Sequence, residues 1–423
     1  MNLNSINTCI VIGAGFSGLI SALYLARKNI KVTIIDKRIF DTTEFRFKTK
    51  LSQQEHVHLL TKAGMEHLFT LFPDFKDKFK LCFFPELDFT EQIKWNGPLG
   101  SYPQFSSGFG KVFTFSRGAI DEFLLDQVKE NSNIHLVTNN KLINASLAEG
   151  KICSIEVFDS IKKSHSIIEA NLYILATGRK FDSYKFLESL NIMSLVKEEI
   201  PSKLFYRSFK FKTDYFKKTQ SKAIMTTTFG DRIPDGAVLY PIEQDKYILT
   251  QVSRDFKDDV ISFCANLHDP EIHTVLKDAT DIKKDYIYKI LGSKRIKFSH
   301  ASNWPQNIVA LGDSVISLNP IFAQGLSVST LHLGKLDEWL NTNKEPIDFQ
   351  KSIDSINDSA WLVGTIEDKR INAKGLKKFF YNIGETYVLF LLKKATSNSK
   401  KYLSLIKVLN FKSSIFSFLK PWS

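Results

Sequence analysis

A glycine-rich turn near the start of the chain restricts the possible fold more than any other feature. The apolar, β-branched run 8–12 leads into Gly13-Ala14-Gly15-Phe16-Ser17-Gly18, and apolar residues at helical spacing follow over 19–26. A second apolar run, 30–35, ends on Asp36. This succession of strand, glycine turn, helix, strand and acidic residue predicts a Rossmann-type unit that binds a dinucleotide.

Each glycine of the turn has its own physical role in such a unit. Gly13 permits the tight turn, Gly15 lets the backbone approach a pyrophosphate, and Gly18 lets the helix pack closely on the sheet. The helix N-terminus offers free N–H groups and the positive end of its dipole to the phosphates. Asp36 is placed to accept ribose hydroxyls, and the adjacent Lys37 joins it as a binding candidate. The unit alone does not distinguish NAD from FAD.

Residues 307–325 favour FAD. An apolar run from Asn307 ends in Gly312-Asp313, which places a carboxylate at the carboxyl end of the sheet, facing the first glycine turn. A carboxylate there can accept hydrogen bonds from the ribityl hydroxyls of a flavin. Pro320 and Gln324-Gly325 form a tight loop before a helix over 326–340, whose N-terminus can stabilise negative charge on a reduced flavin ring. The alternative is a surface turn after a core strand.

The remaining pattern predicts an α/β protein with a discontinuous, Rossmann-type FAD-binding domain. This domain is expected to consist of residues 1–75, 111–180 and 295–345. Alternating apolar runs predict an antiparallel-sheet substrate domain, and helical periodicity predicts a basic helical segment at the end of the chain. The substrate domain is expected over 76–110 and 181–294, and the helical segment over 346–423.

Two local predictions bear on the site. A helix is expected over 53–72, ended by Pro73, and it carries His56 and His58. Residues at i and i+2 of a helix do not share a face, so only one of these histidines is expected to face a ligand. Residues 133–138 and 151–158 are expected to be strands of a meander.

Charge is unevenly distributed along the chain. The net charge is +12, and residues 374–423 contain ten lysines against one acidic residue, Glu385. The rest of the chain is near neutral, which argues against nucleic-acid binding. The basic segment is expected to be either a helical cap on the substrate domain or a peripheral contact with an anionic membrane.

Cysteine usage and hydropathy exclude several classes of protein. The four cysteines are far apart and no Cys/His spacing suits a metal, so we expect structural thiols, no metal and a cytoplasmic location. The sequence has no run of about 18 apolar residues that would predict a membrane span. Its start lacks the pattern of a signal peptide. We expect a monomer or a weak dimer.

Taken together, the motifs resemble class A flavoprotein monooxygenases, whose fold is that of para-hydroxybenzoate hydroxylase. The likeness is to a branch with bacterial FAD-dependent oxidoreductases and epoxidases, and it covers nearly the whole chain. It rests on Gly13-x-Gly15-x-x-Gly18, Asp36, Gln53-x-x-His56-Val57-His58-x-Leu60, Leu71-Phe72-Pro73, Ser116-Arg117, Ala176-Thr177-Gly178-Arg179, Leu267-x-Asp269-Pro270, Gly312-Asp313-Ser314-Val315, Asn319-Pro320, Gln324-Gly325 and Trp361…Glu367-Asp368.

The resemblance implies a role for each matching residue. The first glycine turn and Asp36 would hold the ADP half of FAD. Arg117 would contact the cofactor, and Asp313 would hold the ribityl chain. Pro320 and Gly325 would lie beside the flavin ring, and Arg46 is a weaker candidate. The cofactor-binding candidates are Gly13, Ala14, Gly15, Phe16, Ser17, Gly18, Asp36, Lys37, Arg46, Arg117, Thr177, Gly178, Gly312, Asp313, Pro320, Gln324, Gly325 and Leu326.

The implied reaction is O₂-dependent hydroxylation or epoxidation of an apolar or aromatic, natural-product-like substrate through a flavin C4a-hydroperoxide. His56, His58 and Pro320 are the candidate catalytic residues, although the chemistry requires no particular side chain. Electrons would come from NADPH or NADH, or from a partner reductase. Two departures from the family bear on direct use of NADPH: Thr177-Gly178 replaces an Asp-Gly motif, and Ala323 replaces a glycine.

Other flavin chemistry stays open. A C=C reductase of the geranylgeranyl-reductase kind would use the same scaffold without O₂. A tryptophan-type flavin halogenase is disfavoured because Trp95, Trp304 and Trp361 do not form its W-x-W-x-I-P motif. A disulfide-reductase type is disfavoured because the chain has one G-x-G-x-x-G and no C-x-x-C. A flavin-binding or membrane-associating protein without turnover is the alternative from a different class.

Overall fold

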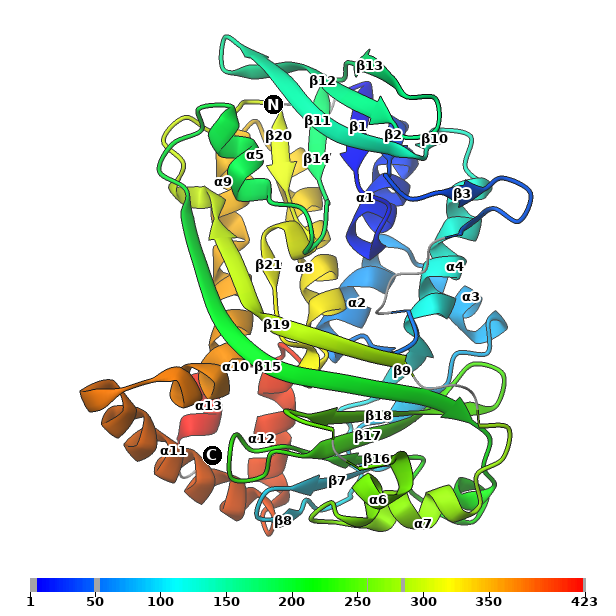
Figure 1. Ribbon diagram of the computed structural model, residues 1–423, viewed down its shortest axis with the longest axis vertical. Coiled ribbons are helices and arrows are strands. Elements are labelled where there is room, and N and C mark those ends of the chain that lie inside the picture. The colour runs from blue at the N-terminus through cyan, green and yellow to red at the C-terminus, as the bar shows by residue number, and fades with distance from the viewer. Residues whose placement is uncertain (1–5, 49–53, 257, 283–285, 421–423) are drawn as a thin grey trace.

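The computed structural model describes residues 6–48, 54–256, 258–282 and 286–420. Its upper half in Figure 1 contains a five-stranded sheet in the order β10-β2-β1-β14-β20. Every neighbouring pair is parallel, so the carboxyl ends of all five strands meet at one edge. The strands are β1 (Thr8–Ile12), β2 (Lys31–Ile35), β10 (Ile134–Val137), β14 (Leu172–Leu175) and β20 (Ile308–Ala310).

Helix α1 (Phe16–Arg27) is enclosed on several sides. It packs against β1 and β2, and also against α4 (Arg117–Lys129) and α8 (Gly325–Leu340). A helix with neighbours all round buries apolar residues all round, and every residue of 18–26 is buried. This packing fixes the first glycine turn, at the N-terminus of α1, against the edge of the parallel sheet. The expected Rossmann-type α/β architecture is confirmed.

Residues 133–138 and 151–158 do not form one meander, so that prediction is wrong. β10 pairs in parallel with β2, because α4 leads into it and a helical crossover returns the chain in the parallel direction. Residues 151–158 lie in a separate antiparallel sheet of order β11-β12-β13. Its strands are β11 (Asn140–Ala148), β12 (Lys151–Asp159) and β13 (Ser164–Ile168).

The helix expected over 53–72 begins later than predicted. Residue 53 lies outside the described residues, and Val57–Leu59 form strand β5, which pairs antiparallel with β9 (Lys111–Ser116). The helix α2 spans Lys62–Leu71, with the Thr61 side chain as its N-cap. Apolar residues at 57, 59 and 60 fit a strand as well as a helix, and Thr61 is the start signal that separates the two.

A second, eight-stranded sheet lies below the parallel sheet in Figure 1, in the order β21-β19-β15-β18-β17-β16-β7-β8. Its pairs are antiparallel except for β16 with β7. The long strands β15 and β19 run from the upper half into the lower half. The strands are β7 (Ile93–Gly97), β8 (Gly100–Ser101), β15 (Val196–Phe211), β16 (Ala223–Thr226), β17 (Gly236–Ile242), β18 (Lys246–Ser253), β19 (Tyr286–Lys297) and β21 (Ile316–Ser317).

The lower end of this sheet is covered by two short helices, α6 and α7, which pack on it through an apolar cluster that includes Phe211, Leu249 and Phe263. This sheet also includes β21, which lies after residue 294 in the sequence. The boundaries of the expected domains stay a prediction. The remaining elements outside the C-terminal segment are α3 (Phe75–Leu81), α5 (Ser183–Ser189), α6 (Val260–Ala265), α7 (Glu271–Lys277), β3 (Phe40–Asp41), β4 (Arg46–Phe47) and β6 (Glu86–Asp88).

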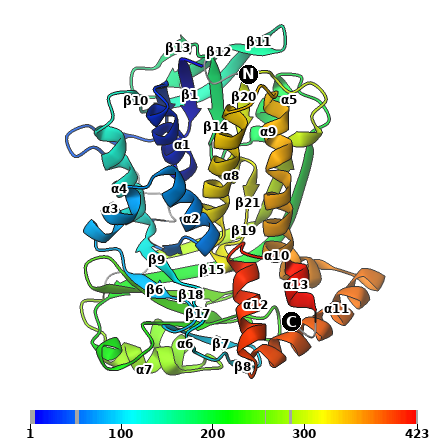
Figure 2. The same cartoon turned by 180° about the vertical axis from the view of Figure 1, so that it is seen from behind.

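The described residues from 346 onward are helical, as expected. Figure 2 shows α12 against the large sheet and α11 projecting from the side of the molecule. No helix among the described residues is both long enough and apolar enough to cross a bilayer. The helices are α9 (Pro346–Ser352), α10 (Asp354–Asn372), α11 (Gly375–Ala395), α12 (Ser399–Leu409) and α13 (Ile415–Leu419).

Candidate functional site

Three turns pack together at the carboxyl edge of the parallel sheet. Gly13 has a φ of +109°, and a Cβ there would overlap the carbonyl oxygen of Ala176, in the turn after β14. A Cβ at Gly18 would overlap the carbonyl oxygen of Gly13. A Cβ at Gly312, after β20, would overlap the Ser17 hydroxyl. Glycine at these positions therefore allows the turns after β1, β14 and β20 to touch.

The N-terminus of α1 is open toward a ligand. Gly15 is the N-cap of α1, and no side chain caps the helix there. No atom of the described residues lies within 4 Å of the place a Gly15 Cβ would occupy, so a pyrophosphate could approach the backbone closely. The predicted residues beside it serve the fold: the Ala14 N–H donates to Asp36, Phe16 is buried, and Ser17 Oγ lies 2.8 Å from Ser329 Oγ.

Asp36 is held at the end of β2 by the first glycine turn and by Arg38. Its carboxylate accepts from the Ala14 N–H at 2.8 Å and from Arg38 Nε at 2.9 Å. Burial raises the pKa of Asp36, but the hydrogen bonds and charge of Arg38 outweigh burial and hold it below its ordinary value. Sequence reasoning missed Arg38, whose signal is its position two residues after the acid. Arg38 Nη2 also donates to the Ala14 carbonyl at 2.8 Å.

Two predicted binding residues lie apart from this turn. Lys37 is exposed. Arg46 donates to both carboxylate oxygens of Asp126 on α4, at 2.8 and 3.2 Å, and so fixes the β3–β4 hairpin to that helix. The sequence contained no indication of this ion pair. A cofactor role for Lys37 and Arg46 stays a prediction.

Asp313 offers its carboxylate to a ligand. It follows β20 in a 3₁₀ turn, Gly312–Ser314, and within the described part of the chain its side chain has no hydrogen-bond partner. Burial raises the pKa of Asp313, and the nearby positive charges of Arg117, Arg179 and Lys294 oppose that shift. Arg117 itself is buried and donates to Asp121 one helical turn along α4, at 2.9 Å.

His332 on α8 positions the Gly312-Asp313 turn, and sequence reasoning missed it. The Gly312 N–H donates to His332 Nδ1 at 3.1 Å, and His332 Nε2 lies 2.8 Å from Asn357 Oδ1. Since an N–H donates to Nδ1, the ring is neutral with its proton on Nε2. Burial lowers the pKa of His332 to about 4. The sequence signal for such a residue is a histidine flanked by Leu331 and Leu333 in the first half of a helix that has no charged residue before Lys335.

We expect acid to destabilise the native state through His332. Its folded pKa of about 4 lies below its unfolded value, so its contribution is complete above about pH 6.5 and is lost as pH falls toward 4. At pH 5 this single residue costs about 2 kcal/mol. Urea unfolding at pH 7 and pH 5 measures the loss, and His332→Gln, which cannot titrate, is expected to show a smaller one. Equal losses for both proteins would contradict this role.

The loop before α8 faces a cavity. Pro320–Phe322 form a 3₁₀ turn, and Ala323 has the left-handed conformation, with a φ of +52°, that a glycine adopts at less cost. Gln324 is buried and donates to the Leu409 carbonyl at 3.2 Å, while its Oε1 has no hydrogen-bond partner in the part of the chain that the structure describes. Gly325 begins α8 without a side-chain cap, and no atom lies within 4 Å of its missing Cβ. Leu326 is buried.

This cavity is lined mostly by apolar side chains. It lies between β5, the large sheet and the Pro320–Ala323 loop, and it has a volume of about 150 Å³. Its walls include Leu59, Phe89, Trp95, Met225, Val238, Tyr240, Val252, Tyr288 and Phe322. An apolar or aromatic molecule would bury its surface here.

His56 and His58 both border the cavity, which corrects the expectation that only one would. His58 lies in strand β5 and His56 in the bend just before it, so neither histidine is on a helix. His56 Nδ1 lies 2.6 Å from Ser208 Oγ, and its buried Nε2 has no hydrogen-bond partner among the described residues. His58 Nδ1 donates to the His56 carbonyl at 3.0 Å. Burial lowers the pKa of His56 to about 4 and that of His58 to about 3, so both are neutral at pH 7.

A second, largely apolar cavity adjoins the first beneath the C-terminal helices. The two share Trp95, Thr227, Thr228, Ile321, Phe322 and Leu409 as lining residues. Helices α10, α11, α12 and α13 supply most of the far wall. The C-terminal segment therefore forms part of the wall of this second cavity.

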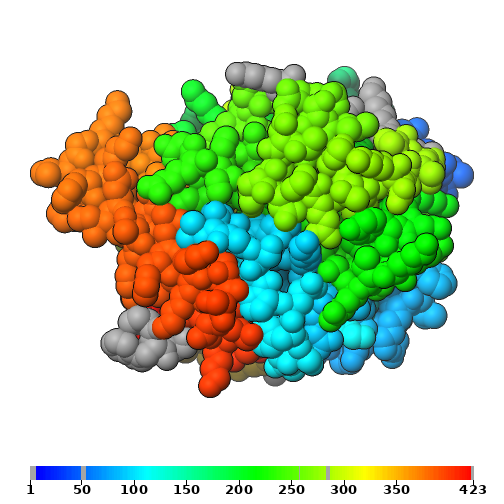
Figure 3. All heavy atoms as spheres, turned by 90° about the horizontal axis from the view of Figure 1, so that it is seen from below, coloured from blue at the N-terminus to red at the C-terminus, as the bar shows by residue number. Residues whose placement is uncertain are grey.

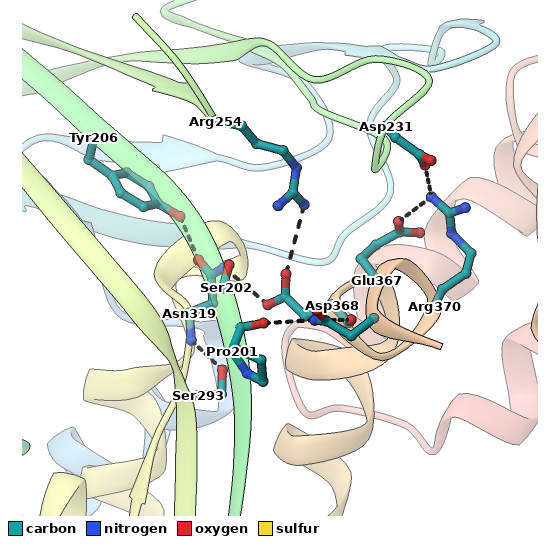
Figure 4. A network of polar contacts seen from close by, with 11 residues as sticks. Pro201, Ser202, Tyr206, Asp231, Arg254, Ser293, Asn319, Glu367, Asp368 and Arg370 are labelled. Carbon is teal, nitrogen blue, oxygen red and sulfur yellow. Dashed lines mark hydrogen bonds and ion pairs between the residues drawn. The ribbon is translucent and has the colours of Figure 1, made fainter. Parts of the chain in front are cut away.

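A polar network borders the second cavity (Figure 4). Tyr206 donates to Asn319 Oδ1 at 2.6 Å, and Asn319 Nδ2 lies 3.5 Å from Asp368. Arg254 lies 3.8 Å from the other oxygen of Asp368. Burial raises the pKa of Asp368, against its hydrogen bonds with Ser202 and Asn319. Arg254 is a polar group at this cavity that sequence reasoning missed, because nothing near it in the sequence marks it.

Comparisons with known proteins agree with this architecture. A family model described as an NAD(P)-binding Rossmann-like domain matches residues 11–40. Protein Rv3254 of Mycobacterium tuberculosis is 20% identical over 407 residues, which cover 90% of this chain and 85% of that protein. The solved structure of PqsL of Pseudomonas aeruginosa, described as a probable FAD-dependent monooxygenase, is 14% identical with a TM-score of 0.64, and covers 90% of this chain and 99% of its own.

Halogenases share the architecture. The flavin-dependent brominase Bmp2 is 14% identical with a TM-score of 0.66, over 96% of this chain and 93% of its own. The chain has the fold of FAD-dependent monooxygenases and halogenases. The resemblance read from the motifs is thus confirmed at the level of the fold. The fit of the site to FAD rests on its own residues: two uncapped helix N-termini, two open glycines and the Asp313 carboxylate.

Proposed function

We propose that this protein is an FAD-dependent monooxygenase that hydroxylates or epoxidises an apolar or aromatic small molecule. The observation that carries the proposal is a continuous arrangement of parts. An open, uncapped helix N-terminus at Gly15, an unpartnered carboxylate at Asp313 and the Pro320–Ala323 loop lead to an apolar cavity. This order suits a cofactor with a pyrophosphate, a polyol chain and a ring next to a substrate.

Particular residues would hold each part of the cofactor. The backbone at Gly13–Gly18 would bind the pyrophosphate, and Asp36 would accept ribose hydroxyls beside Arg38. Asp313 would accept hydroxyls of the ribityl chain, with the Arg117 charge nearby. The N-terminus of α8 at Gly325 would face the ring and favour negative charge on it.

Bound flavin supplies the oxygen chemistry, so the residues of this chain need only position the substrate and exclude water. Apolar walls keep the cavity dry. His56 and His58 are neutral at pH 7, and the free Nε2 of His56 is buried at the cavity. We assign the two histidines to hydrogen bonding with the substrate. Pro320, which is exposed, would lie at the boundary between ring and substrate.

We further propose NADPH or NADH as the electron donor, with a partner reductase as the alternative. Two departures from the family pattern bear on the choice of electron donor: the left-handed Ala323 and the Thr177-Gly178 turn. We propose a monomer or a weak dimer in the cytoplasm, and a peripheral membrane contact, which is developed below.

The test is to purify the protein and record its flavin spectrum. Anaerobic mixing with NADH or NADPH then shows whether the flavin is reduced, and admission of O₂ shows whether O₂ is consumed in the presence of apolar aromatic substrates. We expect bound FAD, reduction by a nicotinamide donor or an added reductase, and substrate-dependent O₂ uptake. A colourless protein that takes up no added FAD would overturn the proposal.

Halogenation is a second candidate because the brominase Bmp2 and the chondrochloren halogenase share this fold. The same assay with bromide or chloride added distinguishes the two reactions, since a halogenated product requires the halide. Product formed without O₂ would instead indicate a C=C reductase. Reduction of flavin that no substrate affects would favour a binding protein without turnover.

A further inference from the structure

Helix α11 presents an apolar stripe to solvent. Leu376, Phe379, Phe380, Ile383, Tyr387 and Phe390 follow one another at intervals of one, three or four residues, which places them on one face of the helix. Their exposed fractions are 78%, 59%, 68%, 54%, 39% and 56%. Four aromatic rings and two aliphatic side chains on one exposed face form a contiguous patch, and such patches mark interaction sites.

The opposite face of α11 is already packed. Leu391 and Ala395 are buried, and Val388 and Leu392 line the second cavity. The helix contacts α10, α12 and α13 on that side. Figure 3 shows the C-terminal segment, in orange, projecting at one edge of the molecule. The stripe is therefore the outer face of a docked helix, and burial inside this chain does not account for its composition.

Both ends of the stripe carry lysines. Lys374, Lys377 and Lys378 stand at one end of it, and Lys393 and Lys394 at the other. Among the described residues 374–420 the one acidic side chain, Glu385, is buried and paired with Arg232 and Arg370. The described part of this segment thus has no exposed acidic side chain of its own, and its lysine-rich surface suits an anionic partner.

The positive charge beside the stripe and the length of the helices indicate what kind of partner binds there. A second copy docked through the same stripe would bring two lysine-rich faces together, and like charges repel. No described helix is long and apolar enough to span a bilayer, which leaves an orientation in the plane of the interface. We propose that α11 lies on an anionic lipid surface, with the stripe in the interfacial layer and the lysines at the headgroups.

This docking would place the second cavity next to the membrane, because the same helix forms a wall of that cavity. The proposal does not depend on flavin chemistry. Membrane docking differs from the role of a helical cap, because a cap would need only the packed face of α11. Not every lysine of the segment belongs to the basic surface. Lys401 on α12 is fully buried and donates to the carbonyls of Phe418 and Lys420.

The test is co-sedimentation of the full chain with vesicles of phosphatidylcholine containing about one-third phosphatidylglycerol. We expect the wild type to bind, and to bind at least about tenfold more weakly to pure phosphatidylcholine or in about 0.5 M NaCl. The variant Phe379→Ser/Phe380→Ser/Phe390→Ser is expected to lose binding by about tenfold or more. All three side chains are exposed, so the fold should be kept.

A matched control removes three exposed apolar side chains elsewhere. Leu81→Ser/Phe83→Ser/Ile167→Ser alters residues that are 76%, 80% and 72% exposed, and it is expected to bind vesicles like the wild type. Circular dichroism and FAD content are measured for each protein, so a loss of fold or cofactor is recognised separately. Wild type that stays in the supernatant, or an α11 variant that binds as the wild type does, would overturn the proposal. A dimer in sedimentation velocity that the α11 variant dissociates would assign the stripe to a second copy instead.

Discussion

We expect Gly15→Val to abolish FAD binding while the protein keeps its fold. The backbone of Gly15 has a φ of −80° and a ψ of 179°, which any residue adopts, and no atom lies within 4 Å of its Cβ position. A valine there would therefore cost the apo protein little. It would instead occupy the space through which a pyrophosphate reaches the N–H groups of α1. Loss of two charge-assisted hydrogen bonds corresponds to a weakening of about a hundredfold or more.

The measurement is a titration of the apo protein with FAD, followed by flavin fluorescence, alongside thermal unfolding without FAD. Gly384→Ala is the matched control, since that glycine also has no atom within 4 Å of its Cβ position but lies on α11. It is expected to bind FAD normally. Gly18→Ala should behave differently from both, because its Cβ would overlap the Gly13 carbonyl and destabilise the apo protein. Unchanged FAD affinity in Gly15→Val would contradict the assigned site.

We expect Arg370→Ala to destabilise the protein by about 3–5 kcal/mol, the usual effect of leaving buried charges without their partner. Arg370 on α10 is 7% exposed and pairs with Asp231 at 2.6 Å and Glu367 at 3.3 Å. Its Nε lies 3.5 Å from Glu385 on α11, whose side chain is 3% exposed. The substitution would leave the charges of Glu367 and Glu385 close to each other without Arg370 between them, beside the large-sheet loop at Gly230.

Urea unfolding at pH 7 measures this effect. Arg232→Ala removes the other arginine paired with Glu385, but its side chain is 59% exposed, so its loss is expected to cost under about 1 kcal/mol. Burial raises the pKa of Glu367, and removal of Arg370 would raise it further, so the deficit of Arg370→Ala should shrink as pH falls and the carboxylates take up protons. Equal effects of the two substitutions would show that the buried network adds nothing to stability.

The nucleotide half of the fold could be predicted from the sequence because its signals are local. Gly13 to Asp36 encodes strand, turn, helix and strand within one segment, and Gly312-Asp313 repeats a strand with a turn. The pairing of β10 with β2 could not be read in the same way, since it depends on the crossover through α4 and not on the strand itself. The start of α2 after Thr61 could not be predicted, because the apolar residues within 57–60 fit a strand as well as a helix.

The ligand cavity was less predictable than the cofactor site. His56 and His58 are recognisable as candidates, but their place at the cavity depends on the pairing of β5 with β9, which joins residues 57–59 to residues 114–116. Arg254, just after β18, and His332, on α8, meet their partners only in the folded chain. Such long-range contacts leave no spacing in the sequence that a motif could capture.

The contact between Gln324 and Leu409 has a consequence for how the protein matures during synthesis. Leu409 ends α12, and the next residue, Asn410, accepts from the Lys62 N–H at the start of α2. The first glycine turn can form early, but these two contacts span 85 and 348 residues. Because a chain emerges N-terminus first, the loop at Pro320–Gln324 cannot settle until α12 has left the ribosome. Uptake of the cofactor is therefore expected to be a late, post-translational step.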